Sequence, residues 1–340
     1  MNPLVNKQIH LAARPGGEPR VEHFRLVETP VPRPADGQVL VRHHYLSLDP
    51  YMRGRMNEGA SYAPPQPLNE VMIGGTVGEV VDSCSARFEV GDTVLGMGGW
   101  QQYQVVDVSR SGSLQKVSGS QVPLSAYLGV LGMPGVTAWY GLLQVIAPKS
   151  GETLVVSAAS GAVGSVVGQL AKIHGCRAVG IAGGPQKCRL VVDDYGFDAC
   201  IDHKRFQDVD SLSAAIAQAC PDGVDAVFEN VGGIILDAVM QRCNAFARIA
   251  LCGMIACYNG EPSPIRAPWL ILVKRLQVEG FVISEHMEVW PEALRELGML
   301  VGSGTLKYRE TVAQGIERAP EAFIGLLKGA NLGKQLVRLI

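Results

Sequence analysis

From about residue 123 onward, short apolar runs rich in β-branched residues alternate with longer stretches of helical periodicity. Such alternation is typical of parallel βαβ units, in which a helix separates each buried strand from the next. The predicted strands lie at residues 153–157, 177–181, 199–201, 226–229, 247–251 and 276–282, and the predicted helices between them at 163–173, 185–195, 212–219 and 234–243. This order predicts an α/β fold with a doubly wound parallel sheet.

Residues 1–125 follow a different pattern, with short β-like runs such as 38–45 and 76–81 between proline and glycine residues. Many short strands without helical periods indicate a compact barrel or sandwich. After a predicted helix at 289–301, the tail reads as a strand at 306–310, a helix at 319–328 and a strand at 334–339. Because the parallel sheet is already complete, we expect the tail to return to the first domain. The predicted domains are residues 1–125 with 305–340, and residues 126–304.

Three glycines, Gly161, Gly164 and Gly168, follow the strand at 153–157 as the pattern turns helical. A strand, tight turn and helix of this kind can bind a pyrophosphate, because glycines allow close backbone approach and the helix start presents N–H groups. Taken alone, the same triplet also fits a packed strand-to-helix turn.

The end of the second predicted strand carries information about the cofactor. An acid there would hydrogen-bond a ribose 2′-hydroxyl, whereas a cation without an acid admits a 2′-phosphate. This chain has no acid between Ile181 and Lys187, and Lys187 opens the next predicted helix. The pattern favours NADP over NAD, although a lone lysine can also be a solvated surface residue. Asn230 ends the fourth strand and Tyr258 follows the fifth, at the edge where such sheets bind ligands; a turn former and a loop cap are the alternatives.

Composition narrows the class of protein. The 340 residues are 47% hydrophobic and 18% charged, with a formal net charge of −2, so no basic footprint for nucleic acid or an anionic membrane surface is expected. Two long uncharged windows are interrupted by glycine and proline and read as buried core, not as membrane spans. None of the eight cysteines forms a C-x-x-C pair, which argues against a structural zinc lobe. Free thiols and an N-terminus without a signal-peptide pattern make the cytoplasm the expected location.

Five segments together resemble one family: residues 47–53, 132–140, 158–164, 229–233 and 331–334. The chain is similar to zinc-independent medium-chain dehydrogenases/reductases of the prostaglandin/leukotriene and alkenal double-bond reductase group. The resemblance implies a GroES-like, partly open β-barrel followed by a Rossmann domain, with the C-terminus returning to the barrel. It also implies a homodimer.

The resemblance further implies a set of residues that bind NADPH/NADP+. The turn residues would cradle the pyrophosphate, Lys187 would hold the 2′-phosphate, and the others would line the ribose and nicotinamide. The full set is Met133, Thr137, Gly161, Ala162, Val163, Gly164, Lys187, His203, Asn230, Cys252, Tyr258 and Asn331. His203 stands where the family commonly has tyrosine, so its contact with the 2′-phosphate is the assignment with least support from the resemblance.

Zinc-dependent relatives need a cysteine early in the barrel and a His-Glu pair after a glycine. Here Ser47 holds the first place and the segment 73–78 contains no histidine, so no metal site is predicted. Without a metal ion to polarise it, the substrate must itself be electrophilic, as a small conjugated carbonyl compound is. We therefore expect NADPH-dependent reduction of the C=C bond of α,β-unsaturated aldehydes or ketones, by hydride transfer to the β-carbon. Tyr51 is the expected pocket wall and Tyr258 the orienting phenol, although Tyr51 also reads as a packed aromatic residue. The alternatives are an NADPH quinone oxidoreductase and an NADPH-binding redox sensor without turnover.

Overall fold

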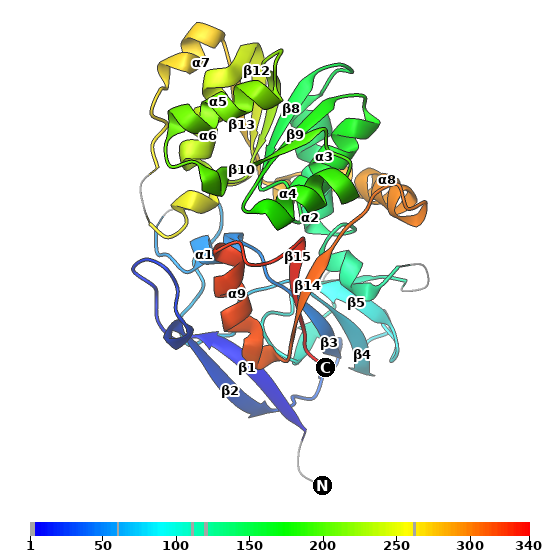
Figure 1. Cartoon of the computed structure of the whole chain (residues 1–340). Helices are drawn as coiled ribbons and strands as arrows, with labels where there is room; N and C mark the ends of the chain where they lie inside the picture. The colour runs from blue at the N-terminus through cyan, green and yellow to red at the C-terminus, as the bar shows by residue number, and fades with distance from the viewer. Residues whose placement is uncertain (1–3, 60, 110–111, 119–121, 261–262) are drawn as a thin grey trace. The chain divides into compact units, whose positions relative to one another are not determined.

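The computed structural model describes residues 4–59, 61–109, 112–118, 122–260 and 263–340. The chain divides into two compact units, one of residues 1–129 with 310–340 and one of residues 130–309 (Figure 1). We call the first the barrel unit and the second the dinucleotide unit. Both divisions fall slightly later in the chain than the expected boundaries at 125 and 305.

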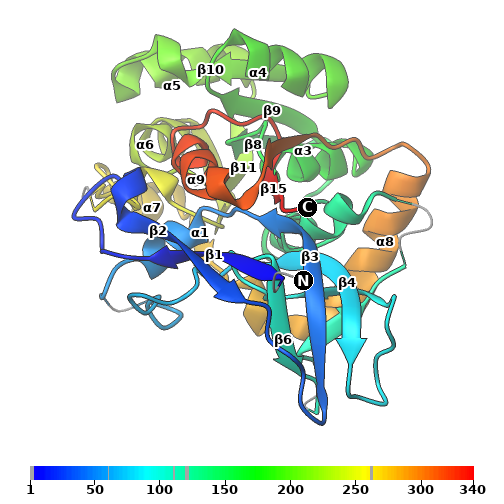
Figure 2. The same ribbon diagram turned by 90° about the horizontal axis from the view of Figure 1, so that it is seen from below.

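A seven-stranded sheet forms most of the barrel unit, with strand order β14-β15-β3-β4-β5-β7 and β6 paired with β3. Figure 2 shows β3 with its two neighbours β4 and β6. A separate antiparallel pair, β1-β2, accompanies it. The strands are β1 (Val5–Leu11), β2 (Phe24–Pro30), β3 (Gln38–Ser47), β4 (Thr76–Ser83), β5 (Thr93–Gly96), β6 (Tyr103–Asp107), β7 (Leu114–Lys116), β14 (Glu310–Gln314) and β15 (Lys334–Arg338), and the helices are α1 (Tyr51–Arg55) and α9 (Ala319–Leu327).

The C-terminal tail belongs to this unit. Strand β15 runs antiparallel to β3, with Leu336 opposite Ser47, and its residues are buried up to Val337. The predicted strand at 306–310 is wrong, because β14 begins only at Glu310. The backbone of Lys307 instead bonds both ways to the side-chain amide of Gln169, at 2.8 Å in each direction, which satisfies it without a neighbouring strand.

Six parallel strands form the sheet of the dinucleotide unit, in the order β10-β9-β8-β11-β12-β13. This is the doubly wound order of a Rossmann domain and confirms the predicted fold class. The strands are β8 (Thr153–Ser157), β9 (Arg177–Ala182), β10 (Ala199–Asp202), β11 (Val224–Glu229), β12 (Cys243–Leu251) and β13 (Gln277–Gly280); the helices are α2 (Met133–Tyr140), α3 (Gly164–Ile173), α4 (Pro185–Arg189), α5 (Val209–Ala219), α6 (Gly233–Arg242), α7 (Trp269–Lys274) and α8 (Trp290–Gly302).

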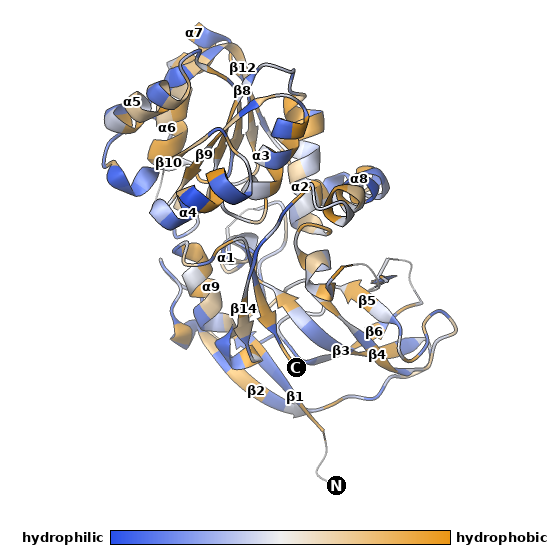
Figure 3. Cartoon of the chain, turned by 45° about the vertical axis from the view of Figure 1, so that its right-hand side comes forward, coloured by the Kyte–Doolittle hydropathy of each residue, from blue (hydrophilic) through white to orange (hydrophobic). Residues whose placement is uncertain are grey.

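The central strands are apolar because helices cover both faces of the sheet. Every residue of β8 is buried, and much of the neighbouring sheet is coloured orange, as hydrophobic, in Figure 3. Strands buried on both faces read as continuous apolar runs, which is why the sequence predicts them well. The predicted helix 185–195 differs in detail, since α4 continues as a π-helical segment over Leu190–Asp194.

Among the described residues, no helix is both long enough and apolar enough to cross a membrane.

Candidate functional site

The turn between β8 and α3 is shaped by close backbone contacts that exclude side chains. A Cβ atom on Gly164 would lie 2.5 Å from the carbonyl oxygen of Ala158, and one on Gly161 would lie 3.1 Å from the same atom. Further along α3, a Cβ on Gly168 would lie 1.7 Å from the Phe197 ring. Close packing against the strand end therefore requires glycine at Gly164 and leaves little room at Gly161, and the Phe197 ring requires glycine at Gly168.

The first turn of α3 can bind an anion. The amide groups at a helix start have no partners within the helix, and the helix dipole adds partial positive charge there. Ala162 and Val163 are half-buried next to Gly161, so this turn stays accessible. Four successive residues, from Gly161 to Gly164, thus combine a compact turn with a helix N-terminus, which fits a pyrophosphate.

A cluster of basic side chains lies where β9 and β10 end, and we call it the cation cluster because a bound anion would favour its charged form. Burial lowers the pKa of Lys187, and the neighbouring Lys204 lowers it further. Burial also lowers the pKa of His203, Asp202 acts in the opposite direction, and Lys204 and Lys187 again lower it. These mutual shifts place three basic side chains within electrostatic reach of one another. A bound phosphate would stabilise the charged form of all three side chains, so the group fits a phosphate site.

Gly183 lies close to two members of this cluster. A Cβ on Gly183 would lie 3.0 Å from His203 Nε2 and 3.1 Å from Lys204 Cε, so a larger residue here would require these two side-chain ends to move slightly. The Asp202 carboxylate accepts hydrogen bonds from the N–H of Gly184 at 2.7 Å and of Lys204 at 3.1 Å. The acid at the end of β10 is therefore engaged in joining the two loops. Sequence reasoning missed Lys204, although its place directly after His203 could have pointed to it.

Asn230 is fixed at the carboxyl end of β11. Its backbone N–H donates to Ser157 Oγ at 2.7 Å, and its side-chain Nδ2 donates to the Ser157 carbonyl at 2.8 Å. The preceding Glu229 is fully buried, and one of its oxygens accepts from Ser157 Oγ and from the N–H groups of Val231 and Gly232. Burial raises the pKa of Glu229. This network locks the ends of β8 and β11 together.

Two further predicted residues follow β12 in the same unit. Burial, with Glu229 nearby, raises the pKa of Cys252 to about 12, so its thiol stays protonated at neutral pH. The Tyr258 hydroxyl lies 3.4 Å from the backbone nitrogen of Met254, in the loop after the strand. A protonated thiol and a phenol are both uncharged at neutral pH, so both can line a site for a neutral ligand.

Met133 begins α2, and Thr137 lies one turn further along that helix. The Thr137 hydroxyl donates to the Met133 carbonyl at 2.7 Å, so its hydrogen is used within the helix. What Thr137 can offer to a ligand is therefore its acceptor oxygen.

Tyr51 and Asn331 belong to the barrel unit. Tyr51 begins α1 and packs against a hydrophobic core that contains Met52 and Trp100. Burial, and then Asp49, raise its pKa, so the phenol remains a hydrogen-bond donor at physiological pH. The Asn331 side chain is buried and donates to the carbonyl of Gly333 at 2.7 Å.

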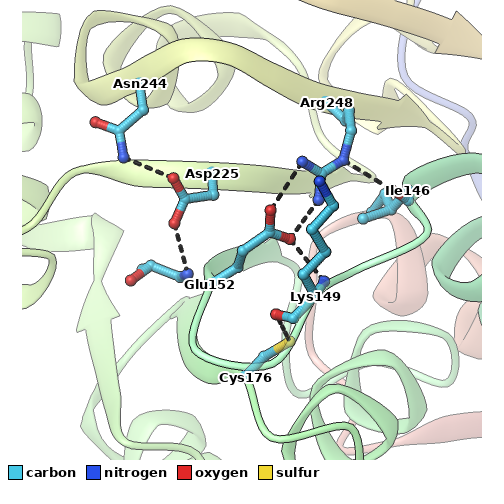
Figure 4. Close-up of polar contacts among 8 residues, drawn as sticks. Ile146, Lys149, Glu152, Cys176, Asp225, Asn244 and Arg248 are labelled. Carbon is cyan, nitrogen blue, oxygen red and sulfur yellow. Dashed lines mark hydrogen bonds and ion pairs between the residues drawn. The ribbon is translucent and has the colours of Figure 1, made fainter.

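The opposite, amino-terminal edge of the parallel sheet has a different character (Figure 4). Arg248 donates through Nη1 to Glu152 Oε1 at 3.0 Å and through Nε to the carbonyl of Ile146 at 2.8 Å, while its Nη2 pairs with Glu152 Oε2. Asp225 accepts from the N–H of Thr153 at 2.9 Å. The Arg248–Glu152 ion pair and the hydrogen bonds that Asp225 accepts make this edge a structural clamp.

Within the described ranges of the chain, no three His, Cys, Asp or Glu side chains gather closely enough to hold a metal ion.

A doubly wound sheet with a glycine turn, a helix N-terminus and a cation cluster at its carboxyl edge defines a class, the NADP-binding oxidoreductases. Residues 7–117 match the family described as the N-terminal domain of oxidoreductase, and residues 162–298 match the family described as zinc-binding dehydrogenase. The chain belongs to the medium-chain dehydrogenases/reductases, in the zinc-independent group of NADPH-dependent double-bond reductases.

Similarity to individual members extends over nearly the whole chain. The NADPH-dependent curcumin reductase of Escherichia coli (strain K12) is 48% identical, covering 98% of this chain and 97% of the relative. The NADP+-dependent 2-alkenal reductase of Nicotiana tabacum is 42% identical over the same shares. The crystal structure of CurA from Vibrio vulnificus in complex with NADPH has a TM-score of 0.92 and 47% identity, covering 98% of this chain and 99% of that one.

Quinone oxidoreductase structures are also similar, but more distantly. The Escherichia coli enzyme in complex with NADPH has a TM-score of 0.77 at 19% identity, which shows a shared fold.

Proposed function

We propose that the protein reduces the C=C bond of α,β-unsaturated aldehydes and ketones with NADPH. The observation that carries the cofactor choice is the cation cluster of Lys187, His203 and Lys204 at the carboxyl ends of β9 and β10. The related curcumin and 2-alkenal reductases support the reaction class, because their names describe reduction of conjugated carbonyl compounds.

The residues present fit NADPH. Gly161 to Gly164 would take the pyrophosphate at the start of α3, and Lys187 with Lys204 and His203 would take the 2′-phosphate. Asn230, Cys252, Tyr258, Asn331, Met133 and Thr137 are the proposed lining of the ribose and nicotinamide. When bound, the cofactor supplies a hydride from its nicotinamide ring.

The protein's own contribution is to position the substrate and stabilise the charge that develops on its carbonyl oxygen. A substrate conjugated to a carbonyl gains negative charge on that oxygen when its β-carbon is reduced, and a fixed hydrogen-bond donor lowers this cost. We propose Tyr258 as the orienting phenol. Tyr51 would form a pocket wall, and its raised pKa keeps it a donor and not an anion.

The direct test compares kcat/KM for a panel of enals and enones with that for quinones, using NADPH. The proposal predicts the higher values for the enals and enones, and a higher value for any quinone would favour a quinone reductase. NADPH that binds but is not oxidised by any panel member would favour a binding protein. Tyr258→Phe should lower kcat more than NADPH affinity, and an unchanged kcat would remove Tyr258 from catalysis.

We also propose a homodimer that uses the β13 edge of the sheet. In the adjoining helix α7, Trp269, Leu272 and Val273 are exposed, with Leu272 at 79%. Apolar side chains gathered beside an edge strand favour association with another chain. Light scattering should give twice the mass of the 36.3 kDa chain, and Leu272→Asp should reduce it to one. A wild-type monomer would contradict this proposal.

The eight cysteines are free thiols, and several are buried. Free thiols persist in reducing surroundings, so we propose the cytoplasm as the location. Cell fractionation tests this, and recovery from an oxidising compartment would contradict it.

A further inference from the structure

A buried lysine in the barrel unit bridges two segments that lie far apart in the sequence. Lys334, the first residue of β15, donates through Nζ to the carbonyl of Leu48 at 2.8 Å and to Asp49 Oδ1 at 2.5 Å. The other carboxylate oxygen of Asp49 accepts from the Ser47 hydroxyl. The side chains of Lys334 and Asp49 are only 5% and 8% exposed, so water contributes little to either charge.

This ion pair is sensitive to the loss of either partner. Burial lowers the pKa of Lys334, while Asp49 and, more weakly, Glu310 act to raise it. Burial also raises the pKa of Glu310, which Ser125 and Lys334 partly offset. A buried pair often contributes no more stability than apolar residues of similar size, but removing one partner leaves an uncompensated charge. The pair is therefore better explained by the geometry it fixes than by net stability.

The geometry that it fixes includes Tyr51. Asp49 is the second residue before Tyr51, and its carbonyl accepts from the N–H of Met52 in the first turn of α1 at 3.1 Å. Asp49 also interacts electrostatically with the Tyr51 phenol. Lys334 thus holds the Leu48 carbonyl and the Asp49 carboxylate directly, and the Ser47 hydroxyl through Asp49. All three groups belong to the turn from Ser47 to Tyr51.

The same lysine closes the segment that begins at Asn331. Asn331 bonds to the carbonyl of Gly333, directly before Lys334. The stem of Lys334 packs beside Gly129, where an added Cβ would lie 3.5 Å from Lys334 Cγ. The lysine is consequently held along its length, which gives its ammonium group a defined position.

We propose that Lys334 is a positioning residue for the reductase reaction, which acts by holding the turn from Ser47 to Tyr51 so that the Tyr51 phenol keeps one orientation. This inference rests on the proposed function, because it assigns Tyr51 to the substrate pocket. Lys334 itself need not touch substrate or cofactor.

A double-mutant cycle between Lys334→Met and Tyr51→Phe tests the proposal, with kcat/KM for an enone as the readout. Positioning through Tyr51 predicts a loss of about tenfold or more for Lys334→Met and a double variant little worse than the poorer single one, since residues that act as a unit are non-additive. Losses that multiply would overturn the proposal. The control is Lys328→Met in the same unit, whose lysine is 59% exposed and pairs with Glu18; it should retain wild-type kcat/KM.

Hydrogen exchange provides a second readout that does not depend on turnover. In Lys334→Met, amides of residues 47–56 should exchange faster, whereas those of β8 and α3 in the dinucleotide unit should not change. If Lys334→Met does not fold, Asp49→Asn replaces it in both experiments with the same expected outcomes. The two proposals fail on different results. A wild-type protein that reduces no enone would refute the proposed function, whereas unchanged hydrogen exchange in residues 47–56 of Lys334→Met would refute the role of Lys334.

Discussion

The two edges of the parallel sheet in the dinucleotide unit use charge in opposite ways. At the amino-terminal edge, Arg248 and Glu152 neutralise each other and Asp225 is occupied by backbone and side-chain donors. At the carboxyl-terminal edge, burial lowers the pKa of His203, and Lys204 and Lys187 lower it further, while the neighbouring Asp202 carboxylate is engaged with two backbone N–H groups. A satisfied edge stabilises the fold, and an edge with like charges kept close is prepared for an anionic ligand.

The largest expected effect comes from filling the glycine turn. Gly164→Ala places a Cβ 2.5 Å from the Ala158 carbonyl oxygen, so the start of α3 must shift. Overpacking of this kind costs about 1–3 kcal/mol, and we expect NADPH affinity to fall by up to about 150-fold, measured by titration. The control is Gly298→Ala in α8, where no atom lies within 4 Å of the added Cβ. Equal NADPH affinity for both variants would contradict the role of the turn.

Removing a cation from the carboxyl edge should be nearly as damaging, but for one cofactor only. Lys187→Ala should raise the KM for NADPH by about 10- to 150-fold, the value of a charged hydrogen bond of about 1.5–3 kcal/mol, and leave NADH nearly unchanged. Lys149→Ala is the matched control, because Lys149 is an exposed lysine at the amino-terminal edge. An equal change for both cofactors would reject the assignment of Lys187.

The reverse pattern is expected at the amino-terminal edge. Arg248→Met should lower the free energy of unfolding by about 1–3 kcal/mol, because it leaves Glu152 largely buried without its partner, and should not alter the KM for NADPH. Burial tends to raise the pKa of Glu152, but the bonds from Arg248 and Lys149 leave it lowered. A carboxyl with a lowered folded-state pKa contributes stability above its unfolded pKa and loses it as pH falls. The difference in free energy of unfolding between variant and wild type, measured with urea, should therefore shrink as the pH falls. A difference that stays constant with pH would show that the loss of stability does not depend on the charge of Glu152.

The smallest effect concerns His203. Its pKa is below the ordinary value in the free protein, and a bound phosphate would raise it. Binding then takes up a proton, so NADPH affinity should weaken by a few-fold, about 2- to 5-fold, as pH rises from 6 to 8. His203→Gln should flatten this dependence in fluorescence titrations. A slope that survives the substitution would assign it to another group.

Some features of the dinucleotide unit were predictable from the sequence and others were not. Strands β8, β9 and β11 were predictable because nearly all of their residues are buried, and the glycine turn because steric exclusion leaves only glycine at Gly164 and Gly168. The π-helical continuation after α4 and the pairing of Lys307 with Gln169 depend on tertiary contacts that no local pattern encodes. Lys204 was not predicted, because only its position directly after His203 distinguishes it from the other lysines of the chain.

Lys187 and the neighbouring basic side chains at the carboxyl edge of this sheet are proposed to hold the 2′-phosphate of NADPH. Isothermal titration with 2′,5′-ADP and 5′-AMP isolates that contact from the rest of the cofactor. Wild type should bind 2′,5′-ADP at least about tenfold more tightly than 5′-AMP, and Lys187→Ala should remove most of the difference. Equal binding of the two nucleotides by wild type, or a preference that persists in Lys187→Ala, would contradict this proposal.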